Sequence, residues 1–154
     1  MAKFTYQDRE AKAFFVPAGD YVLGVKSAVM ALSKSSGNEQ IELQLEVVHG
    51  PKLKPDQKGV VLYDYLIFGE KTDWRIDLFL KACKRQPKKG DELDINDEWL
   101  SKHVVGALLW AQLVEDEYQG KKKNKIGQYL NNMQEDPYKL FVGYMPTSSE
   151  GDEL

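Results

Sequence analysis

Apolar and polar residues alternate most regularly in residues 41–47. Apolar side chains take every second position, at Ile41, Leu43, Leu45 and Val47. Polar side chains fill the positions between them, at Glu42, Gln44 and Glu46. A period of two is typical of a strand with one face in a core and the other in water. This segment therefore predicts a half-buried strand, which His49, Gly50 and Pro51 end.

Two further strands flank this one. The turn residues 17–20 precede a first strand at residues 21–32, which contains Gly24 and the small residues Ser27 and Ala28. Small residues inside a long strand favour a bend or a bulge. Residues 60–68 predict a third strand that is apolar on both faces, with Tyr63 and Tyr65 on the same side.

The pattern then changes to a helical period. Four apolar residues follow the spacing i, i+3, i+4 and i+7, at Ile76, Phe79, Leu80 and Cys83. This spacing predicts one amphipathic helix, which Thr72 or Asp73 caps and Pro87 and Gly90 close. Residues 97–100 suggest a short turn. A fourth strand at 104–114, a hairpin turn at 115–120 and a returning strand at 123–130 come next. Residues 138–145 read as an added strand or a docked arm.

The predicted order is three strands, one helix and two strands. The OB fold, a five-stranded Greek-key barrel with one helix between strands 3 and 4, has this order. We therefore expect a mainly β, OB-fold-like domain at residues 1–135, including the N-terminal lead-in. Residues 136–154 are expected to form a C-terminal arm and a flexible acidic tail. Other small α+β folds share this order, so the order alone does not fix the barrel.

Composition narrows the class of protein. The 154 residues are 42% hydrophobic and 29% charged, which is ordinary for a globular domain. We see neither an apolar run long enough to span a membrane nor an N-terminal secretory signal. The lone Cys83 excludes an internal disulfide and fits a reducing cytoplasm.

The residues for catalysis are sparse. The chain has two histidines, and it lacks the paired His and Cys spacings of metal sites, glycine-rich phosphate loops and a nucleophile elbow. Acids cluster at Asp91, Glu92, Asp94, Asp97 and Glu98. Such a run is more often a solvated loop than an ion site. We therefore expect no enzyme activity, no cofactor and no metal, with a metal-dependent nuclease as one rival hypothesis.

The net charge of −3 hides a clustered distribution. Three acids lie in the last five residues, and without them the body carries equal numbers of acids and bases. Four lysines follow the predicted hairpin turn, at Lys121, Lys122, Lys123 and Lys125. A second basic group lies at residues 81–89. Lysines at a hairpin tip either bind phosphates or protect the strand edge from aggregation, and four in five residues favour binding.

Single-strand binding also needs flat rings that stack on bases. The candidate rings are Tyr63, Tyr65, Trp110 and Tyr118, and Lys26 and Lys34 are further candidate phosphate contacts. Strand aromatics are more often core residues, so burial is the alternative for these rings. Trp110 faces either a helix or the ligand groove. Glu42 and Glu46 oppose this hypothesis, because they would repel phosphates from their face of the second strand.

The tail ends with Glu150, Asp152, Glu153 and Leu154. An acidic end with a hydrophobic last residue suits a basic pocket, either on a partner or on the protein itself. Simple solubilisation explains the same composition equally well.

Several short motifs also resemble those of a phage-encoded family long catalogued as of unknown function. They are Val16-Pro17-Ala18-Gly19-Asp20-Tyr21, Lys34-Ser35-Ser36-Gly37, Trp74-Arg75-Ile76, Phe79-Leu80-Lys81-Ala82, Gly106, Glu117-Tyr118-Gln119-Gly120 and Asn124-Lys125-Ile126, over roughly residues 14–130. The resemblance implies an OB-type single-stranded DNA-binding protein encoded near phage replication and recombination genes. It also implies that the tail recruits replication or recombination proteins.

The sequence thus predicts sequence-independent binding of single-stranded DNA through lysine–phosphate contacts and aromatic stacking. Assembly into a homo-oligomer stays open. The alternative is a phage accessory module that binds a recombinase or a host enzyme and never contacts DNA.

Overall fold

The protein is built around one antiparallel sheet. The computed structural model describes residues 2–6, 15–133 and 135–146, without the side chains of Asp56 and Tyr118. The strands are β1 (Gly19–Leu32), β2 (Glu39–His49), β3 (Val61–Ile67), β4 (Leu108–Tyr118) and β5 (Lys121–Leu130). Their order in the sheet is β3-β2-β1-β4-β5. The mainly β class and the presence of all five expected strands are confirmed. The expected bounds of the fourth strand and its turn are wrong, because β4 extends to Tyr118 and the turn is only residues 119–120.

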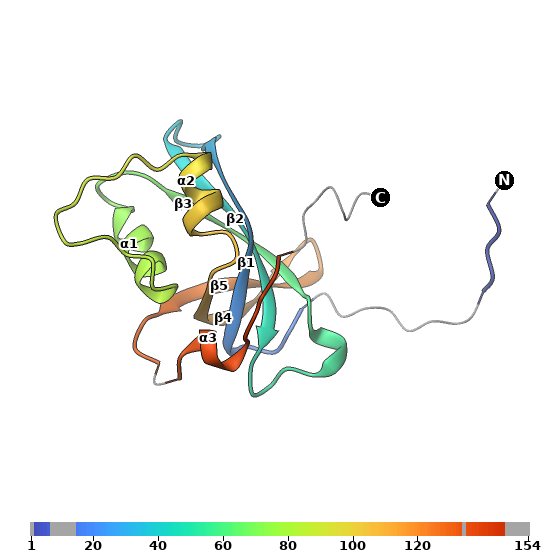
Figure 1. Cartoon of the computed structure of the whole chain (residues 1–154). Coiled ribbons are helices and arrows are strands. Elements are labelled where there is room, and N and C mark those ends of the chain that lie inside the picture. The colour runs from blue at the N-terminus through green and yellow to red at the C-terminus, as the bar shows by residue number, and fades with distance from the viewer. Residues whose placement is uncertain (1, 7–14, 134, 147–154) are drawn as a thin grey trace.

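Short helices lie around the sheet (Figure 1). They are α1 (Asp73–Ala82), α2 (Asp97–His103), α3 (Pro137–Leu140) and the 3-10 turn η1 (Pro55–Gln57). Two helices, not the single one predicted, therefore separate β3 from β4. The sequence suggested only a turn at α2 because this helix is two turns long and buries one residue fully, Leu100. Its N-terminus is fixed by Asn96, whose Oδ1 accepts a 2.8 Å hydrogen bond from the Trp99 amide.

β1 is bent, as its small residues predicted. Its pairing with β2 shifts between Val22 and Leu23 and again between Val25 and Ser27. Each shift inserts a residue into one strand and increases the local twist. β1 therefore pairs with β2 along most of its length and with β4 through its first half, at Gly19 to Gly24.

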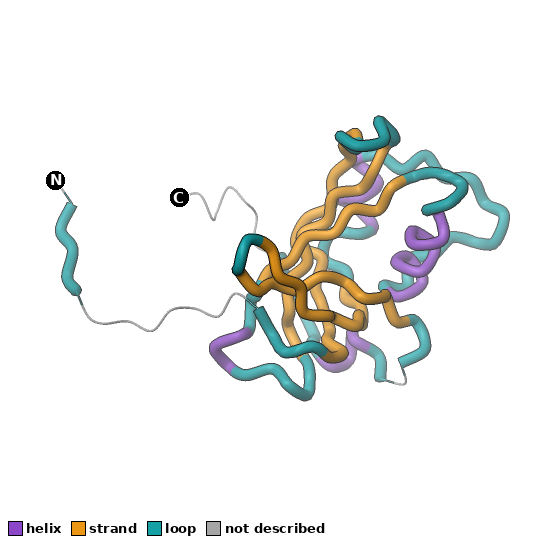
Figure 2. The backbone as a smooth tube through the Cα atoms, turned by 180° about the vertical axis from the view of Figure 1, so that it is seen from behind, coloured by secondary structure: helices purple, strands orange, loops and turns teal. Residues whose placement is uncertain are grey.

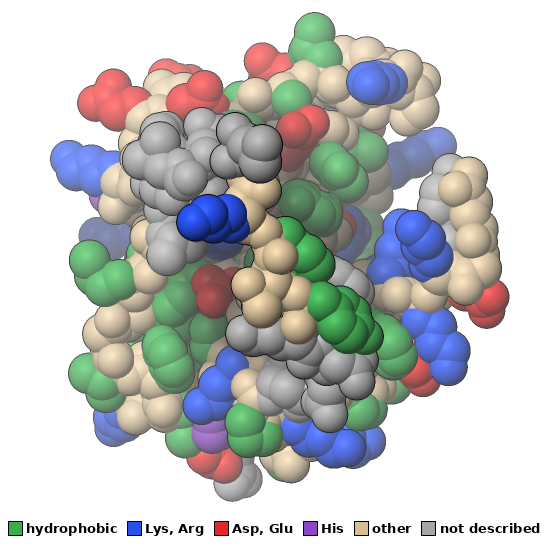
Figure 3. Space-filling model, turned by 90° about the vertical axis from the view of Figure 1, so that its right-hand side faces the viewer, with side chains coloured by type: hydrophobic (Ala, Val, Ile, Leu, Met, Phe, Trp, Pro, Cys, Tyr) green, Lys and Arg blue, Asp and Glu red, His purple; other side chains and the backbone are tan. Residues whose placement is uncertain are grey.

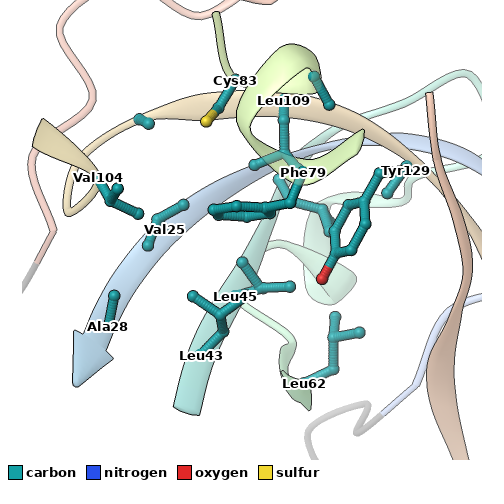
Figure 4. Packing of buried hydrophobic residues seen from close by; sticks show 14 of the residues in the cluster. Val25, Ala28, Leu43, Leu45, Leu62, Phe79, Cys83, Val104, Leu109 and Tyr129 are labelled. Atoms are coloured by element: carbon teal, nitrogen blue, oxygen red, sulfur yellow. The ribbon is translucent and has the colours of Figure 1, made fainter. Parts of the chain in front are cut away.

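The hydrophobic core lies on the concave face of the curved sheet, where α1 covers it. The alternation in β2 is confirmed, because Ile41, Leu43, Leu45 and Val47 are almost fully buried. Figure 4 shows the Phe79 ring of α1 inserted among residues from several strands. Its ring centroid lies 5.2 Å from that of Tyr129 on β5, in an edge-to-face arrangement. The predicted helical stripe therefore packs into the open end of the curled sheet.

The sheet curls without closing into a hydrogen-bonded barrel. β3 and β5 form its two edges, and no strand pairing joins them within the described part of the chain. Side chains connect these edges instead. Arg75 of α1 makes a 2.7 Å ion pair with Asp64 of β3, and the Tyr129 hydroxyl of β5 donates to the same carboxylate oxygen. Arg75 also donates to the Tyr65 carbonyl, a backbone acceptor at this edge. The sheet expected to form an OB-like barrel therefore has all five strands but is not closed by strand pairing, and its two edges meet at an open seam.

The segment after β5 is a docked arm, one of the two forms expected for it. We use "C-terminal arm" for residues 135–146, which cross the outer face of β1 and β4. The Trp110 indole donates to the Glu135 carbonyl at 2.9 Å, and the Tyr138 hydroxyl donates to the Cys83 carbonyl at 2.6 Å. The Tyr144 hydroxyl donates to Glu46 at 3.0 Å. This arm covers a second, smaller apolar cluster outside the main core.

Candidate nucleic-acid interface

A groove lies where the open seam meets the β4–β5 hairpin. It has a volume of about 350 Å³ and runs between the first residues of β3 and the middle of β5. The side chains that line it include Tyr63, Tyr65, Asp116, Lys123, Asn124 and Lys125. Figure 2 shows the hairpin tip beside the start of β3. Four of the predicted binding residues therefore line one surface feature.

Both tyrosines of this groove are exposed. Tyr63 is 58% exposed and Tyr65 is 49% exposed. The reason is strand parity, because Leu62 and Leu66 face the core and the odd-numbered residues between them face outward. Two rings at i and i+2 on one strand lie roughly 7 Å apart on the same face. The alternative of a core role for these two residues is wrong.

The lysines sit on a tight two-residue hairpin. Gln119 and Gly120 connect β4 to β5 with positive φ angles of 52° and 77°, which is the conformation of a type I′ turn. All four lysines of the hairpin are exposed. Lys123 and Lys125 alternate with the buried Asn124, so they lie on the outer face and line the groove. Lys121 lies nearest the tip, and the Lys122 ammonium lies 5.9 Å from the centre of the Phe15 ring.

Acidic residues on β4 oppose these lysines. Asp116 pairs across the ladder with Lys123, and Glu117 pairs with Lys122. Residues 115–125 contain four lysines and three acids, so the hairpin carries a net charge of about +1. Figure 3 likewise shows acidic and basic side chains interspersed on one face, with hydrophobic side chains between them. The positive field is therefore local to individual ammonium groups rather than spread over the whole surface.

Three other residues that were predicted to bind nucleic acid do not line the groove. Trp110 is only 6% exposed and lies under the C-terminal arm, so its ring has no open face for a base. Its prediction as a stacking residue fails because the arm covers the outer face of β4. Lys34 is exposed in the β1–β2 loop, beyond the far end of β3. Lys26 is half-buried at the β1 bulge, next to Ser27, and the β2 partner of Ser27 is Gln44, which is opposite Tyr63.

Some predictions concern parts that the structure does not describe. The Tyr118 side chain lies outside the described set, although its backbone pairs with Lys121 at the hairpin tip. The tail residues Glu150, Asp152, Glu153 and Leu154 also lie outside the described residues. Their proposed roles stay predictions.

Polar side chains of β2 share the outer face with Tyr63 and Tyr65. The sequence pattern indicated only that the acids among them would repel phosphates. Glu42 is the direct cross-strand partner of Tyr65, and Gln44 is the partner of Tyr63. Directly opposed residues of an antiparallel pair project from the same face, with Cβ atoms about 5 Å apart. The alternation in β2 indicated that these residues point outward, but only the strand register shows which ring each one accompanies.

A partly buried polar cluster lies behind the β3 edge of the groove. Asp64 accepts hydrogen bonds from both Arg75 and Tyr129. Burial raises the pKa of Tyr129 well above its ordinary value of 10.0, and the adjacent Asp64 carboxylate raises this pKa further. Tyr129 therefore stays neutral and acts as a hydrogen-bond donor. This cluster fixes the edge of β3 that carries the two exposed rings.

The acidic run at residues 91–98 does not assemble into an ion site. Asp91, Glu92 and Asp94 are exposed in the α1–α2 loop, and Asp97 uses Oδ1 to accept a 2.7 Å hydrogen bond from the Met30 amide. No group of three or more His, Cys, Asp or Glu side chains suited to a metal occurs among the residues described. Among the same residues, no helix is long and apolar enough to span a bilayer.

The fold and the groove together define a small, mainly β domain with exposed aromatic and basic residues at the open seam of its sheet. The chain belongs to the family described as "Protein of unknown function (DUF669)", which matches residues 2–151. The match supports the expected membership of a family of unknown function, and that description assigns no ligand. No curated protein matches the chain.

Proposed function

We propose that the protein is a non-enzymatic, single-stranded DNA-binding protein with an OB-type fold. The strand order β3-β2-β1-β4-β5, with β3 and β5 brought together around α1, supports the OB interpretation. OB folds commonly bind single strands across strands 2 and 3 and the loop between strands 4 and 5. The groove lies in this region.

One observation carries the proposal, namely that exposed rings and ammonium groups line the same groove. Tyr63 and Tyr65 offer flat faces for stacking, which is worth about 1–3 kcal/mol per base. Lys123 and Lys125 lie across the groove from them and suit phosphate contacts. Stacking and backbone neutralisation both tolerate any base, so binding is largely independent of sequence.

The biological setting rests on the resemblance of the sequence motifs to a phage-encoded family. We propose a role in phage DNA replication or recombination within the cytoplasm of a bacterial host. The acidic end of the chain is proposed to bind replication or recombination proteins. Comparing pull-downs of such proteins by the intact chain and by a chain lacking residues 147–154 tests the role of this tail.

The first experiment is a titration of fluorescently labelled oligo-dT at two salt concentrations. We expect binding that weakens as salt rises, because each phosphate contact on a single strand adds about 0.7 to the slope of log affinity against log salt. Replacing both Lys123 and Lys125 with alanine should lower the slope by about 1.4, through two lost contacts. The matched control replaces Lys102 and Lys139, which are exposed on α2 and α3. An unchanged slope in the first variant would remove the hairpin from the site.

The aromatic contribution has its own test. Replacing Tyr63 and Tyr65 with alanine should cost about 1–3 kcal/mol of binding free energy per ring that stacks. Replacing them with phenylalanine keeps the flat face and should retain most of the affinity. If the alanine variant binds oligo-dT as tightly as the parent protein, these rings do not stack on bases.

A second candidate function is an accessory module that binds a recombinase or a host enzyme without contacting DNA. Asp116 inside the groove and Glu42 and Glu46 on the adjacent strand favour it, because carboxylates repel phosphates. Absence of oligonucleotide binding even at very low salt would replace the first proposal with this one.

A further inference from the structure

The outer face of β2 and β3 places a carboxylate beside an exposed ring. Glu42 and Tyr65 are directly opposed across the β2–β3 ladder, so their side chains project side by side. Tyr65 is 49% exposed, whereas Glu42 is half-buried. The carboxylate is therefore close enough to this ring to contact a base that stacks on it.

Glu42 is held in place by a buried neighbour. Gln40 is only 7% exposed, and its Nε2 donates a 3.2 Å hydrogen bond to Oε2 of Glu42. This contact limits the rotamers of the carboxylate before any ligand arrives. Each carboxylate oxygen carries two acceptor sites, so both oxygens keep accepting capacity. The carboxylate is thus oriented on the face that carries the rings.

The next acid along β2 has a different environment. Glu46 lies on the same outer face, but its Oε1 already accepts the 3.0 Å hydrogen bond from the Tyr144 hydroxyl of the C-terminal arm. It is paired across the ladder with Val61, not with a ring. Gln44, opposite Tyr63, carries both a donor and an acceptor and therefore suits any base. Only Glu42 combines an acceptor-only group with an exposed ring on this stretch of the two strands.

We propose that Glu42 gives the site a preference for guanine at the position that stacks on Tyr65. A carboxylate only accepts hydrogen bonds. The Watson–Crick edge of guanine presents two adjacent donors, N1–H and the N2 amino group, which match the two carboxylate oxygens. Thymine presents one donor between two carbonyl acceptors, and adenine and cytosine each place a ring-nitrogen acceptor beside their amino group.

This inference rests on the proposed function and deepens it. Binding stays largely independent of sequence, because phosphate contacts and stacking dominate. Bidentate base contacts usually discriminate by roughly 5-fold to more than 100-fold. We expect the lower end, about 5- to 10-fold, because Glu42 is partly exposed to competing water.

The test compares two oligonucleotides that differ by one amino group per repeat. Labelled (TTG)8 and (TTI)8, in which I is inosine, are titrated in lithium buffer, with oligo-dT of equal length as the reference. Inosine keeps the N1–H donor and lacks the N2 amino group. We expect the parent protein to bind the guanine strand about 5- to 10-fold more tightly than the inosine strand.

The variant Glu42→Gln and its control Glu46→Gln remove one negative charge each from the same strand and face. Both should bind oligo-dT and the inosine strand somewhat more tightly, because repulsion of phosphates falls. Only Glu42→Gln should bring the guanine-to-inosine ratio to within about twofold of unity. A ratio that persists in Glu42→Gln overturns the assignment to Glu42.

The possible failures are distinguishable. If the parent protein binds none of the three oligonucleotides at low salt, the proposed function itself is wrong. If it binds all three equally, the function stands and the guanine preference is overturned. This comparison uses the unaltered chain, so it decides the question even if a variant does not fold.

Discussion

Asn124 is a buried polar residue on β5 whose side chain holds a segment far away in the sequence. Its Oδ1 accepts a 2.8 Å hydrogen bond from the Val16 amide, and its Nδ2 donates to the Val16 carbonyl at 2.9 Å. The same Nδ2 lies 3.4 Å from the Val114 carbonyl. An amide side chain thus replaces a missing strand partner for Val16 and fixes the start of the described domain against β5.

Replacing Asn124 with alanine leaves the Val16 amide and carbonyl without these partners. Buried groups that lose a partner cost about 1–3 kcal/mol, so we expect the free energy of unfolding to fall by that amount. Urea denaturation measures the change. The control Asn131→Ala alters an exposed residue just beyond β5 and should change stability by less than about 0.5 kcal/mol. Equal stabilities of the two variants would contradict this role of Asn124.

The sequence predicted individual residues well where strand parity decides the outcome. It placed Tyr63 and Tyr65 on one face and four lysines on one hairpin, and both placements are confirmed. It could not show that Glu42 accompanies Tyr65, because that depends on the register between two strands. Register follows from turn geometry and packing over the whole sheet, which a local pattern does not contain.

At the scale of elements, the C-terminal arm depends on a position without a side chain. The Tyr144 ring lies directly over Gly24 of β1, and a Cβ atom added there would lie 2.3 Å from the ring. Gly24 therefore provides the space in which the arm rests, in addition to its place near the bulges of β1. The weak local pattern of residues 138–145 gave no sign of this contact.

We predict that Gly24→Ala forces the Tyr144 ring off β1 and loosens the arm. Overpacking of this kind costs about 1–3 kcal/mol, and Trp110 beneath the arm should become more accessible to a fluorescence quencher. A double-mutant cycle with Tyr144→Ala provides the check, because removing the ring restores the space. If Gly24→Ala costs the same in both backgrounds, the contact with Tyr144 is not the cause.

The residue at which a helix ends was harder to predict from the sequence than the side of a strand that faces the core. The apolar stripe suggested a helix extending toward Pro87, but α1 ends at Ala82. Lys84 adopts a left-handed conformation with φ of 59°, and the Arg85 amide bonds back to the Leu80 carbonyl at 2.8 Å. Glycine is the usual residue at such a position, so a lysine there gave no signal of the end.

At the scale of the whole molecule, the buried Cys83 thiol and Tyr129 phenol make the free energy of unfolding depend on pH in the alkaline range. Burial raises the pKa of Cys83 from its ordinary value of 9.0 to about 12, and it raises the pKa of Tyr129 well above 10.0. Above about pH 9 the unfolded chain therefore releases protons that the folded chain retains. Stability is complete below that pH and falls as pH rises, because the unfolded state then binds fewer protons.

We expect the free energy of unfolding to decrease between pH 9 and pH 12, by up to about 1.4 kcal/mol per pH unit for each such group. Urea titrations across this range measure the slope. Cys83→Ala should make the slope shallower from pH 9, whereas Tyr129→Phe should make it shallower only from about pH 10. A stability that does not change up to pH 11 would contradict this linkage.

The order of strands and helices was predictable from the sequence. Whether the sheet closes into a barrel was not. The sequence predicted five strands with helical structure after the third, because each of these elements has a local sequence pattern of its own. Whether β3 and β5 join depends on the curl accumulated over the whole sheet and on Arg75, Asp64 and Tyr129, which lie far apart in the sequence. The groove at the seam is a product of that incomplete closure.

The burial of Cys83 has a practical consequence for attaching probes. It is the single cysteine of the chain and is fully buried beside α1. Its thiolate, the form that reacts with alkylating reagents, is scarce at neutral pH. A cysteine introduced on the surface, for example Ser101→Cys on α2, should therefore be labelled selectively in the native protein. Reaction at position 83 itself would then report molecules that have opened or unfolded.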